Sequence, residues 1–265
     1  MIPKALLPVL LAVALLGLPA GAQAEDLYHH LHLRSGDALA SAQWYKDHMD
    51  CEEYGREGAC MVDNIQIIFY TNEDQPTGPS VGSGVDHIGF SFRDLEAKME
   101  GWKAAGVKVL EDIREVPGLF KLAFLEDPWG TKIEVVEDHT WLGFHQIHLS
   151  TPDPQATLNW YESLFGGVPD KLHGRLDGLR YGGLWLLARP YDGEIAPTGG
   201  RSVDHLGWPS DDLDTTAAEY ENMGIELDDP GVREVTNAVG QELKIAFVTS
   251  DDGVRIELVE TISSP

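Results

Sequence analysis

The stretch "VDHIGFSFRDL" (residues 85–95) recurs in the second half of the chain as "VDHLGWPSDDL" (residues 203–213). Two more stretches recur in the same order: "LHLRSGDALASAQWY" (31–45) as "IHLSTPDPQATLNWY" (147–161), and "KLAFLEDPWGTKIEVVE" (121–137) as "KIAFVTSDDGVRIELVE" (244–260). The copies lie 147 − 31 = 116, 203 − 85 = 118 and 244 − 121 = 123 residues apart. Ordered repeats at a slowly drifting spacing indicate a duplication. We therefore predict two domains, residues 27–138 and 143–260.

Each domain is itself doubled. A short apolar strand carrying a histidine is followed by an aspartate and then by a stretch with helical spacing of apolar residues. The aspartates occupy the positions of helix N-caps, where a carboxylate accepts free backbone N–H groups: Asp37, Asp94, Asp153 and Asp212. Short strands follow each helix, some joined by hairpins such as the one around residues 127–130. The sequence thus predicts an α+β fold of four βαβββ modules.

Residues 1–24 have the pattern of a secretory signal peptide: a basic start at Lys4, an apolar run over residues 5–18, and an A-x-A motif ending at Ala24. The apolar run is shorter than the roughly 20 residues that a membrane-spanning helix needs. We expect cleavage after Ala24 and export to the periplasm or the medium, with no stable membrane span in the mature chain. An uncleaved membrane anchor is the alternative.

The mature chain is strongly acidic. The leader contains one lysine and no acidic residue, so 18 Lys and Arg remain against 44 Asp and Glu, a net charge of 18 − 44 = −26. Such a chain repels phosphate backbones, which disfavours nucleic acid as a partner. The charge is spread along the chain, as is typical of a solvated surface. We expect a small molecule as the partner, and the sequence leaves the oligomeric state open.

The two cysteines lie in the stretch "CEEYGREGAC" (residues 51–60). A type II′ turn centred on Gly55-Arg56 would place Cys51 opposite Cys60 in a hairpin. Because an exported protein meets an oxidising compartment, we predict a structural disulfide between Cys51 and Cys60. The alternative is two free cysteines, one of them packed in the core.

The repeated blocks resemble the vicinal oxygen chelate superfamily, which includes glyoxalases, bleomycin-resistance proteins and extradiol dioxygenases. The resemblance covers residues 27–260 and is carried by "HLHLRSGD…WY", "VDHIGF…DL" and "DPWGTKIEVVE" with their second copies. It implies βαβββ modules paired so that their sheets form an open, curved cup around a divalent metal. Since this fold supports several activities, the residues lining the cup must identify the function.

The resemblance assigns the metal ligands of the first domain to His30, His87 and Glu134. Each histidine stands seven residues before its capping aspartate, and Glu134 lies on the last strand of the domain. Two imidazoles and one carboxylate form a facial set that binds Fe(II) and leaves coordination positions open for a chelating substrate. We expect one divalent metal, Fe(II) or Mn(II), with Zn(II), Ni(II) and Co(II) as alternatives. Taken singly, each residue also fits a surface or satisfied core position.

The second domain is an altered copy, because Gln146 stands at the position that corresponds to His30. The other two expected ligands, His205 and Glu257, keep their residue types. A glutamine can offer a carbonyl oxygen, and His148 lies two residues on, in phase with Gln146 along the strand. A second metal site of Gln146, His148, His205 and Glu257 and a domain without a metal both remain open.

The first strand, "YHHLHL" (residues 28–33), contains three histidines. Regular pleating puts Tyr28, His30 and His32 on one face and His29 on the other. His32 is therefore the candidate for proton transfer beside the metal, and orienting a metal ligand is its alternative role. We expect His29 to point away from the site.

The resemblance also bears on the reaction. Glyoxalase I-type sites add a glutamate ligand from the last strand of the first module, and the corresponding segments "IQIIFYT" and "LWLLARP" are apolar here. A three-ligand set is similar to that of extradiol dioxygenases and fosfomycin-resistance transferases. We expect a metal-dependent enzyme for a small substrate with vicinal oxygens, with ring-cleaving dioxygenase as the first choice. The alternatives are a glyoxalase-like lyase or isomerase, a non-catalytic small-molecule binder, and a scaffold with a vestigial site.

Overall fold

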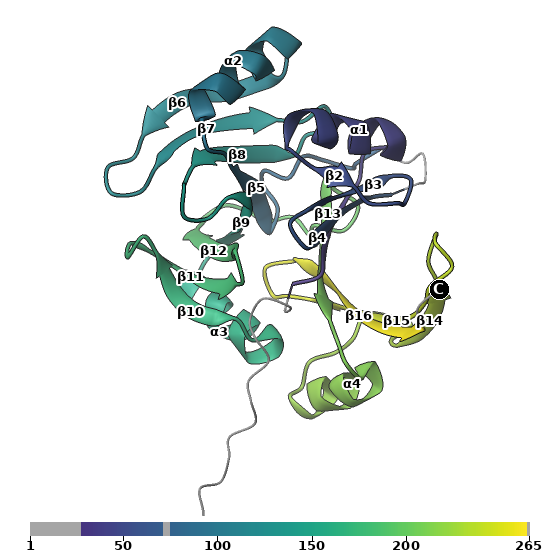
Figure 1. The fold of residues 1–265 in the computed structure, drawn as a ribbon. Coiled ribbons are helices and arrows are strands. Elements are labelled where there is room, and N and C mark those ends of the chain that lie inside the picture. The colour runs from purple at the N-terminus through teal and green to yellow at the C-terminus, as the bar shows by residue number, and fades with distance from the viewer. Residues whose placement is uncertain (1–27, 71–74, 264–265) are drawn as a thin grey trace, which may run out of the picture.

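The computed structural model describes residues 28–70 and 75–263 (Figure 1). The predicted signal peptide, residues 1–24, lies outside these ranges. Within them, no helix has the length and apolar character required to cross a membrane. The helices of the described chain are α1 (Ala38–His48), α2 (Leu95–Ala105), α3 (Pro154–Phe165) and α4 (Leu213–Asn222).

The strands form two eight-stranded sheets. Across the first sheet their order is β14 (Arg233–Thr236), β15 (Glu242–Thr249), β16 (Arg255–Ser263), β13 (Val203–Pro209), β1 (His30–Leu33), β4 (Ile65–Phe69), β3 (Ala59–Val62) and β2 (Glu52–Glu53). Across the second sheet it is β10 (Val168–Leu172), β11 (Leu176–Tyr181), β12 (Leu184–Pro190), β9 (Gly143–Thr151), β5 (Val85–Ser91), β8 (Lys132–Glu137), β7 (Lys121–Glu126) and β6 (Lys108–Glu115). The predicted fold of four strand–helix–three-strand modules is confirmed.

The two sheets do not coincide with the two sequence repeats. β1 pairs antiparallel with β13, and β5 pairs antiparallel with β9. The first sheet therefore joins the first and fourth modules, and the second sheet joins the second and third modules (Figure 1). Each cup draws its lining from both halves of the sequence.

The predicted helix starts are confirmed at all four modules. Each helix follows an extended aspartate whose Oδ1 accepts the backbone N–H three residues further on, over 2.9–3.1 Å. Such caps satisfy one of the free N–H groups at the helix end and stabilise it by about 1 kcal/mol. The capping residues are Asp37, Asp94, Asp153 and Asp212.

Alternation along each strand separates the core from the cup. In β1, Leu31 and Leu33 are buried in the main hydrophobic core, and the residues between them face the other side of the sheet. One polar contact crosses this core: Tyr45 of α1 donates a hydrogen bond to Asp127 Oδ2, 3.0 Å away in the β7–β8 hairpin. Asp127 Oδ1 also accepts the backbone N–H groups of Trp129 and Thr131. Asp127 thereby ties the first module to the second.

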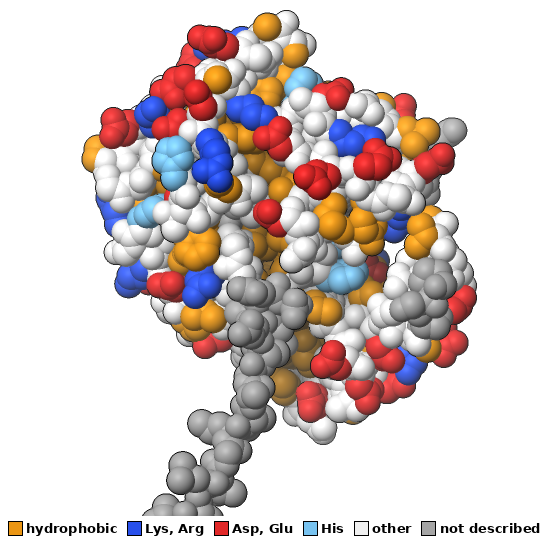
Figure 2. Space-filling view, in the orientation of Figure 1, with side chains coloured by type: hydrophobic (Ala, Val, Ile, Leu, Met, Phe, Trp, Pro, Cys, Tyr) orange, Lys and Arg blue, Asp and Glu red, His pale blue; other side chains and the backbone are white. Residues whose placement is uncertain are grey.

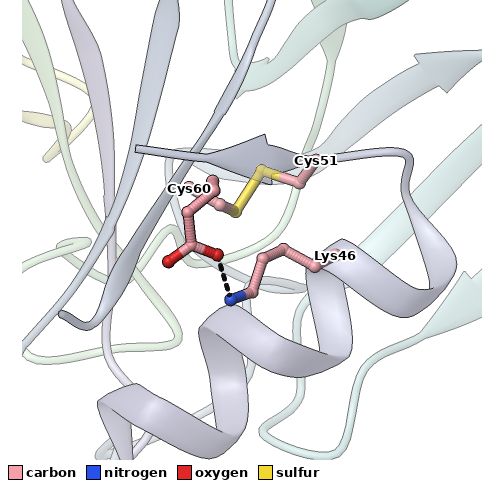
Figure 3. Close-up of a disulfide and its surroundings, with 4 residues drawn as sticks. Lys46, Cys51 and Cys60 are labelled. Carbon is pink, nitrogen blue, oxygen red and sulfur yellow. Dashed lines mark hydrogen bonds and ion pairs between the residues drawn. A yellow bond between two sulfur atoms is a disulfide. The ribbon is translucent and has the colours of Figure 1, made fainter. Parts of the chain in front are cut away.

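Cys51 and Cys60 form the predicted disulfide (Figure 3). The expected register of the hairpin is wrong, because Glu53 and not Cys51 lies opposite Cys60. A longer turn, in which Gly55 and Gly58 both have positive φ angles, replaces the expected two-residue turn. Lys46 of α1 binds the Glu53 carboxylate at 2.9 Å beside the disulfide (Figure 3).

The disulfide closes a short loop on the edge of the first sheet. Closing a loop of this size removes unfolded-state entropy equivalent to about 3 kcal/mol. We predict that the double variant Cys51→Ser/Cys60→Ser loses about that amount of unfolding free energy in urea denaturation. Reduced wild-type protein is the matched control and should unfold like the variant; equal stability of oxidised and reduced protein would contradict the prediction.

Asp127 should give the protein a pH-dependent stability. Burial raises the pKa of Asp127 from 3.8 to about 6, although its hydrogen bonds oppose the shift. The folded state therefore favours the protonated acid, and this contribution is complete below pH 4 and lost as the pH rises through 6. Relative to wild type, Asp127→Asn should gain about 2 kcal/mol of unfolding free energy between pH 4 and pH 7. Urea titrations of both proteins across this range measure the change. A difference in unfolding free energy that does not depend on pH would contradict the prediction.

Candidate metal centres

Four side chains meet in the first sheet, and we call them site A: His30, His32, His205 and Glu257. Glu257 Oε2 lies 3.1 Å from His30 Nε2 and 2.9 Å from His205 Nε2. His32 Nδ1 lies 2.9 Å from His205 Nε2. His30, His205 and Glu257 are 2%, 1% and 9% exposed, so these polar atoms converge in a buried place. Two imidazoles and one carboxylate are the donors of a facial metal site.

Three adjacent strands position site A. His32 of β1 lies opposite His205 of β13, and Glu257 of β16 lies opposite Gly207 of β13. His30 also lies opposite Gly207, and a Cβ atom at that glycine would overlap the His30 imidazole. The glycine therefore lets the ring cross β13 towards Glu257.

A related cluster, which we call site B, lies in the second sheet: His87, Glu134, Gln146 and His148. His87 Nε2 is 2.9 Å from Glu134 Oε2, and Gln146 Nε2 donates to the same oxygen. The His148 ring packs against the His87 ring with centroids 4.7 Å apart. His87, Glu134 and His148 have ligand atoms close enough to share an ion. Gln146 takes the place that His30 has in site A.

The expected grouping of His30 with His87 and Glu134 is wrong. His30 lies in the first sheet, whereas His87 and Glu134 lie in the second. The second expected set is divided in the same way, because Gln146 and His148 join His87 and Glu134, while His205 and Glu257 join His30. The reason is that modules pair across the repeats. β1, with His30, lies beside β13 and not in the sheet of β5, and β9, with Gln146 and His148, lies beside β5 and not in the sheet of β13. Every residue expected as a ligand lies in one of the two clusters.

His29 was expected to point away from the site, and this is also wrong. The backbone N–H of His29 bonds to the carbonyl of Gly207, the residue that His30 faces, so two residues of the first strand oppose one of β13. Such a bulge turns consecutive side chains to one side. His29 Nδ1 lies 2.8 Å from His30 Nδ1, while Tyr28 packs in the core against Trp208. The spacing of core residues, Tyr28 followed by Leu31 rather than by residue 30, is the sequence signal for this bulge.

Burial and ion pairing set the charges of site A. Burial lowers the pKa of His30 despite its contact with Glu257, and burial with the charge of His205 places the pKa of His32 well below its usual value. Burial opposes ionisation of Glu257, yet hydrogen bonds from His205 and His30 hold its pKa well below the usual range. Burial also lowers the pKa of His205, but Asp204 and Glu257 outweigh it and raise that pKa. Burial thus favours the neutral rings of His30 and His32, whereas ion pairing favours the charged forms of His205 and Glu257.

A buried aspartate orients one histidine in each site, a role the sequence reading missed. Asp204 Oδ1 lies 2.8 Å from His205 Nδ1, and Asp86 Oδ1 lies 2.6 Å from His87 Nδ1. Each carboxylate is held by two cations, for example Arg255 at 3.2 Å on Asp204. Such partners fix the ring so that Nε2 faces the metal position. The repeated "VDH" tripeptide is the signal that could have identified them.

The walls of the two cups differ. In site A the residue of β4 beside His30 is Gln66, half-buried, in a strand that was expected to be apolar throughout. In site B the equivalent neighbour of Gln146 is Trp185, which is 1% exposed. Trp185 belongs to a buried apolar cluster in the second sheet: Phe120, Leu122, Val136, Leu172, Trp185 and Leu187. The apolar cluster of the first sheet is smaller and consists of Ile245, Phe247 and Val259.

Comparison with known proteins places this geometry in a family. Residues 27–135 match the family model described as the Glyoxalase/Bleomycin resistance protein/Dioxygenase superfamily, and no curated protein sequence matches the chain. Among solved structures, glyoxalase I from Zea mays aligns with a TM-score of 0.65 and 17% identity over 88% of this chain and 92% of that chain. A "putative dioxygenase" from Bacillus subtilis aligns with a TM-score of 0.61 and 15% identity over 92% and 87% of the two chains.

Identities this low show a common fold and nothing about the reaction. The family match covers the first repeat, and the common fold extends over the second repeat with its own capping aspartates and ligand strands. Residues 27–135 therefore belong to the glyoxalase, bleomycin resistance and dioxygenase superfamily, and the described chain has the fold of two such domains in tandem.

Proposed function

We propose that site A is the divalent-metal centre of an enzyme whose small substrate chelates the metal through two adjacent oxygens. The observation that carries this proposal is the convergence of His30 Nε2 and His205 Nε2 on Glu257 Oε2 in a buried place. Charged groups in a core are normally paired or bound to a metal, and these three have the donor types of a metal site. A metal ion explains their presence, since it uses all three.

The donor chemistry of site A fits such an ion. Burial favours neutral imidazoles at His30 and His32, and a metal needs the unprotonated ring. Asp204 binds Nδ1–H of His205, which leaves Nε2 to face Glu257 and the metal position. His30, His205 and Glu257 would hold Fe(II) or Mn(II), and Zn(II), Ni(II) or Co(II) would fit the same donors. When bound, the ion acts as a Lewis acid that polarises the substrate oxygens.

His32 is the residue of site A that is suited to move a proton. It lies beside the three ligands, and its ring stacks on Tyr70 with centroids 4.3 Å apart and an interplanar angle of 8°. The Tyr70 hydroxyl donates to Asp204 Oδ1 at 3.2 Å, which fixes this stack. Because burial keeps His32 neutral, its ring can accept the proton that a substrate hydroxyl gives up on binding.

Ring-cleaving dioxygenase is the reaction class that these residues favour most. It needs a three-donor metal site and a nearby base for a catechol proton, and site A offers both. A lyase or isomerase of the glyoxalase type is the second candidate, and Gln66 beside His30 favours it because that position would add a polar oxygen to the set. We assign no catalytic step to site B, because Trp185 and its apolar neighbours fill the second sheet around it.

We also propose that the protein works outside the cytoplasm. The leader pattern of residues 1–24 motivates this proposal. The disulfide between Cys51 and Cys60 supports it, since disulfides persist in oxidising compartments. Fractionation of cells that express the full chain tests it; protein found only in the cytoplasm would exclude export.

Measurements of metal binding by variants can distinguish site A from site B. We predict that the mature chain binds Fe(II), Mn(II) or Zn(II) and that His205→Ala weakens binding at site A by more than about a hundredfold, because a ligand is lost. His87→Ala is the matched control, since it removes the equivalent histidine of site B and leaves site A intact. Isothermal titration calorimetry and elemental analysis give the affinities and stoichiometries. Equal binding by wild type and His205→Ala would exclude site A.

The proton-transfer role predicts a different phenotype. His32→Asn should retain the metal but lower turnover by about a hundredfold, because the base is lost while the ligands remain. Oxygen uptake over a panel of catechols measures turnover, and elemental analysis confirms metal loading. If the Fe(II)-loaded wild type consumes oxygen no faster than a control without protein, the dioxygenase assignment is wrong. If His32→Asn turns over as fast as wild type, His32 does not transfer the proton.

A further inference from the structure

The turn between β2 and β3 lies at the edge of site A. Ala59, the residue that follows this turn, lies opposite Ile68 of β4, Ile68 lies opposite His32, and His32 lies opposite His205. These residues form one continuous row across the sheet, and the turn begins where the row ends. Gly55 and Gly58, both with positive φ, bound the turn, and Arg56 lies between them.

Arg56 is a cation without an anionic partner. Its side chain is half-buried, its Nε is buried without a hydrogen-bond partner, and no ion pair to it occurs in residues 28–70 and 75–263. Glu53, an acid of the same hairpin, is bound by Lys46 (Figure 3). Acidic side chains are abundant on the surface (Figure 2), yet none of those in the described residues forms an ion pair with Arg56. A buried donor without a partner calls for a ligand.

Arg56 and the titratable groups of site A affect one another's pKa values. Burial lowers the pKa of Arg56, and the carboxylate of Glu257 acts against that effect. In turn, the charge of Arg56 adds to the lowering of the pKa of His30. These effects agree with the row of paired residues that places the turn of Arg56 at the edge of site A. Two other arginines beside site A, Arg34 and Arg255, are bound to Asp204.

We propose that Arg56 binds a carboxylate group of the substrate of site A, in addition to the vicinal oxygens that the metal binds. The inference rests on the proposed function, because it names the substrate class of the same site. A guanidinium binds a carboxylate through two parallel hydrogen bonds, which both orient and select the ligand. Phe247 and Ile245 form an apolar wall in the same sheet, so the body of the substrate is an aromatic or aliphatic acid.

The disulfide restrains the turn that carries Arg56. Cys51 and Cys60 close the base of the hairpin, and β3 continues into the sheet that carries His30. A side chain that is held before binding loses less entropy when the ligand arrives. The second sheet has an arginine on its equivalent hairpin, Arg175, but that guanidinium donates to the carbonyl of Pro117. Arg175 is therefore engaged by a carbonyl of the protein, whereas Arg56 Nε has no hydrogen-bond partner among the described residues.

Three probes test the proposal on Zn(II)-loaded and metal-free protein: catechol, benzoate and 3,4-dihydroxybenzoate. Catechol has only the vicinal oxygens, benzoate has only the carboxylate, and 3,4-dihydroxybenzoate has both. We expect wild type to bind 3,4-dihydroxybenzoate ten- to a hundredfold more tightly than catechol, as a charged hydrogen-bonded pair provides. Arg56→Gln should abolish this preference and leave the affinity for catechol unchanged, and Arg175→Gln should behave as wild type.

The outcomes separate this inference from the proposed function. Loss of benzoate and 3,4-dihydroxybenzoate affinity in Arg56→Gln supports the carboxylate site, even if binding is independent of Zn(II) and the metal proposal fails. An unchanged preference in Arg56→Gln overturns the carboxylate site, whether or not catechol requires the metal. An equal loss in Arg56→Gln and Arg175→Gln also overturns it, because the effect is then not specific to site A.

Discussion

Antiparallel pairing of β1 with β13, and of β5 with β9, is the constraint on which both candidate sites depend. It brings His30 of the first module within hydrogen-bond distance of Glu257 of the fourth. The same rule brings Gln146 of the third module to Glu134 of the second. The rest of each site follows from the pleat, because residues that alternate with buried leucines and isoleucines must face the cup.

The sequence was sufficient for much of this fold. Strand, helix and turn signals predicted four modules, and the capping aspartates Asp37, Asp94, Asp153 and Asp212 start the helices as expected. It also predicted the disulfide and the residues that gather in the two clusters, although not how they are grouped. It could not predict which modules share a sheet, since two repeats of equal pattern can pair within or across the duplication with the same local contacts. The bulge at His29 and the hairpin register at Cys51 depend on non-local pairing in the same way.

The two sites have diverged in both donors and walls. Site A keeps two imidazoles on one carboxylate oxygen, and a half-buried glutamine flanks them. Site B replaces one imidazole by the amide of Gln146 and the flanking glutamine by Trp185. Both retain the buried aspartate behind one histidine, which orients a ring whether or not chemistry follows. After the duplication, one cup thus came to be filled with apolar side chains while the other has a polar lining.

The pairing of the first module with the fourth affects the order in which the two sheets can form during synthesis. Site A unites β1, which begins at His30, with β16, which begins at Arg255. During synthesis the second sheet can assemble from contiguous modules before the chain is finished, whereas the first sheet must wait for the last strand. Any chain released early therefore lacks Glu257 and can carry a folded second sheet with no site A. The side chains of site A can therefore come together only after the chain has been synthesised through β16.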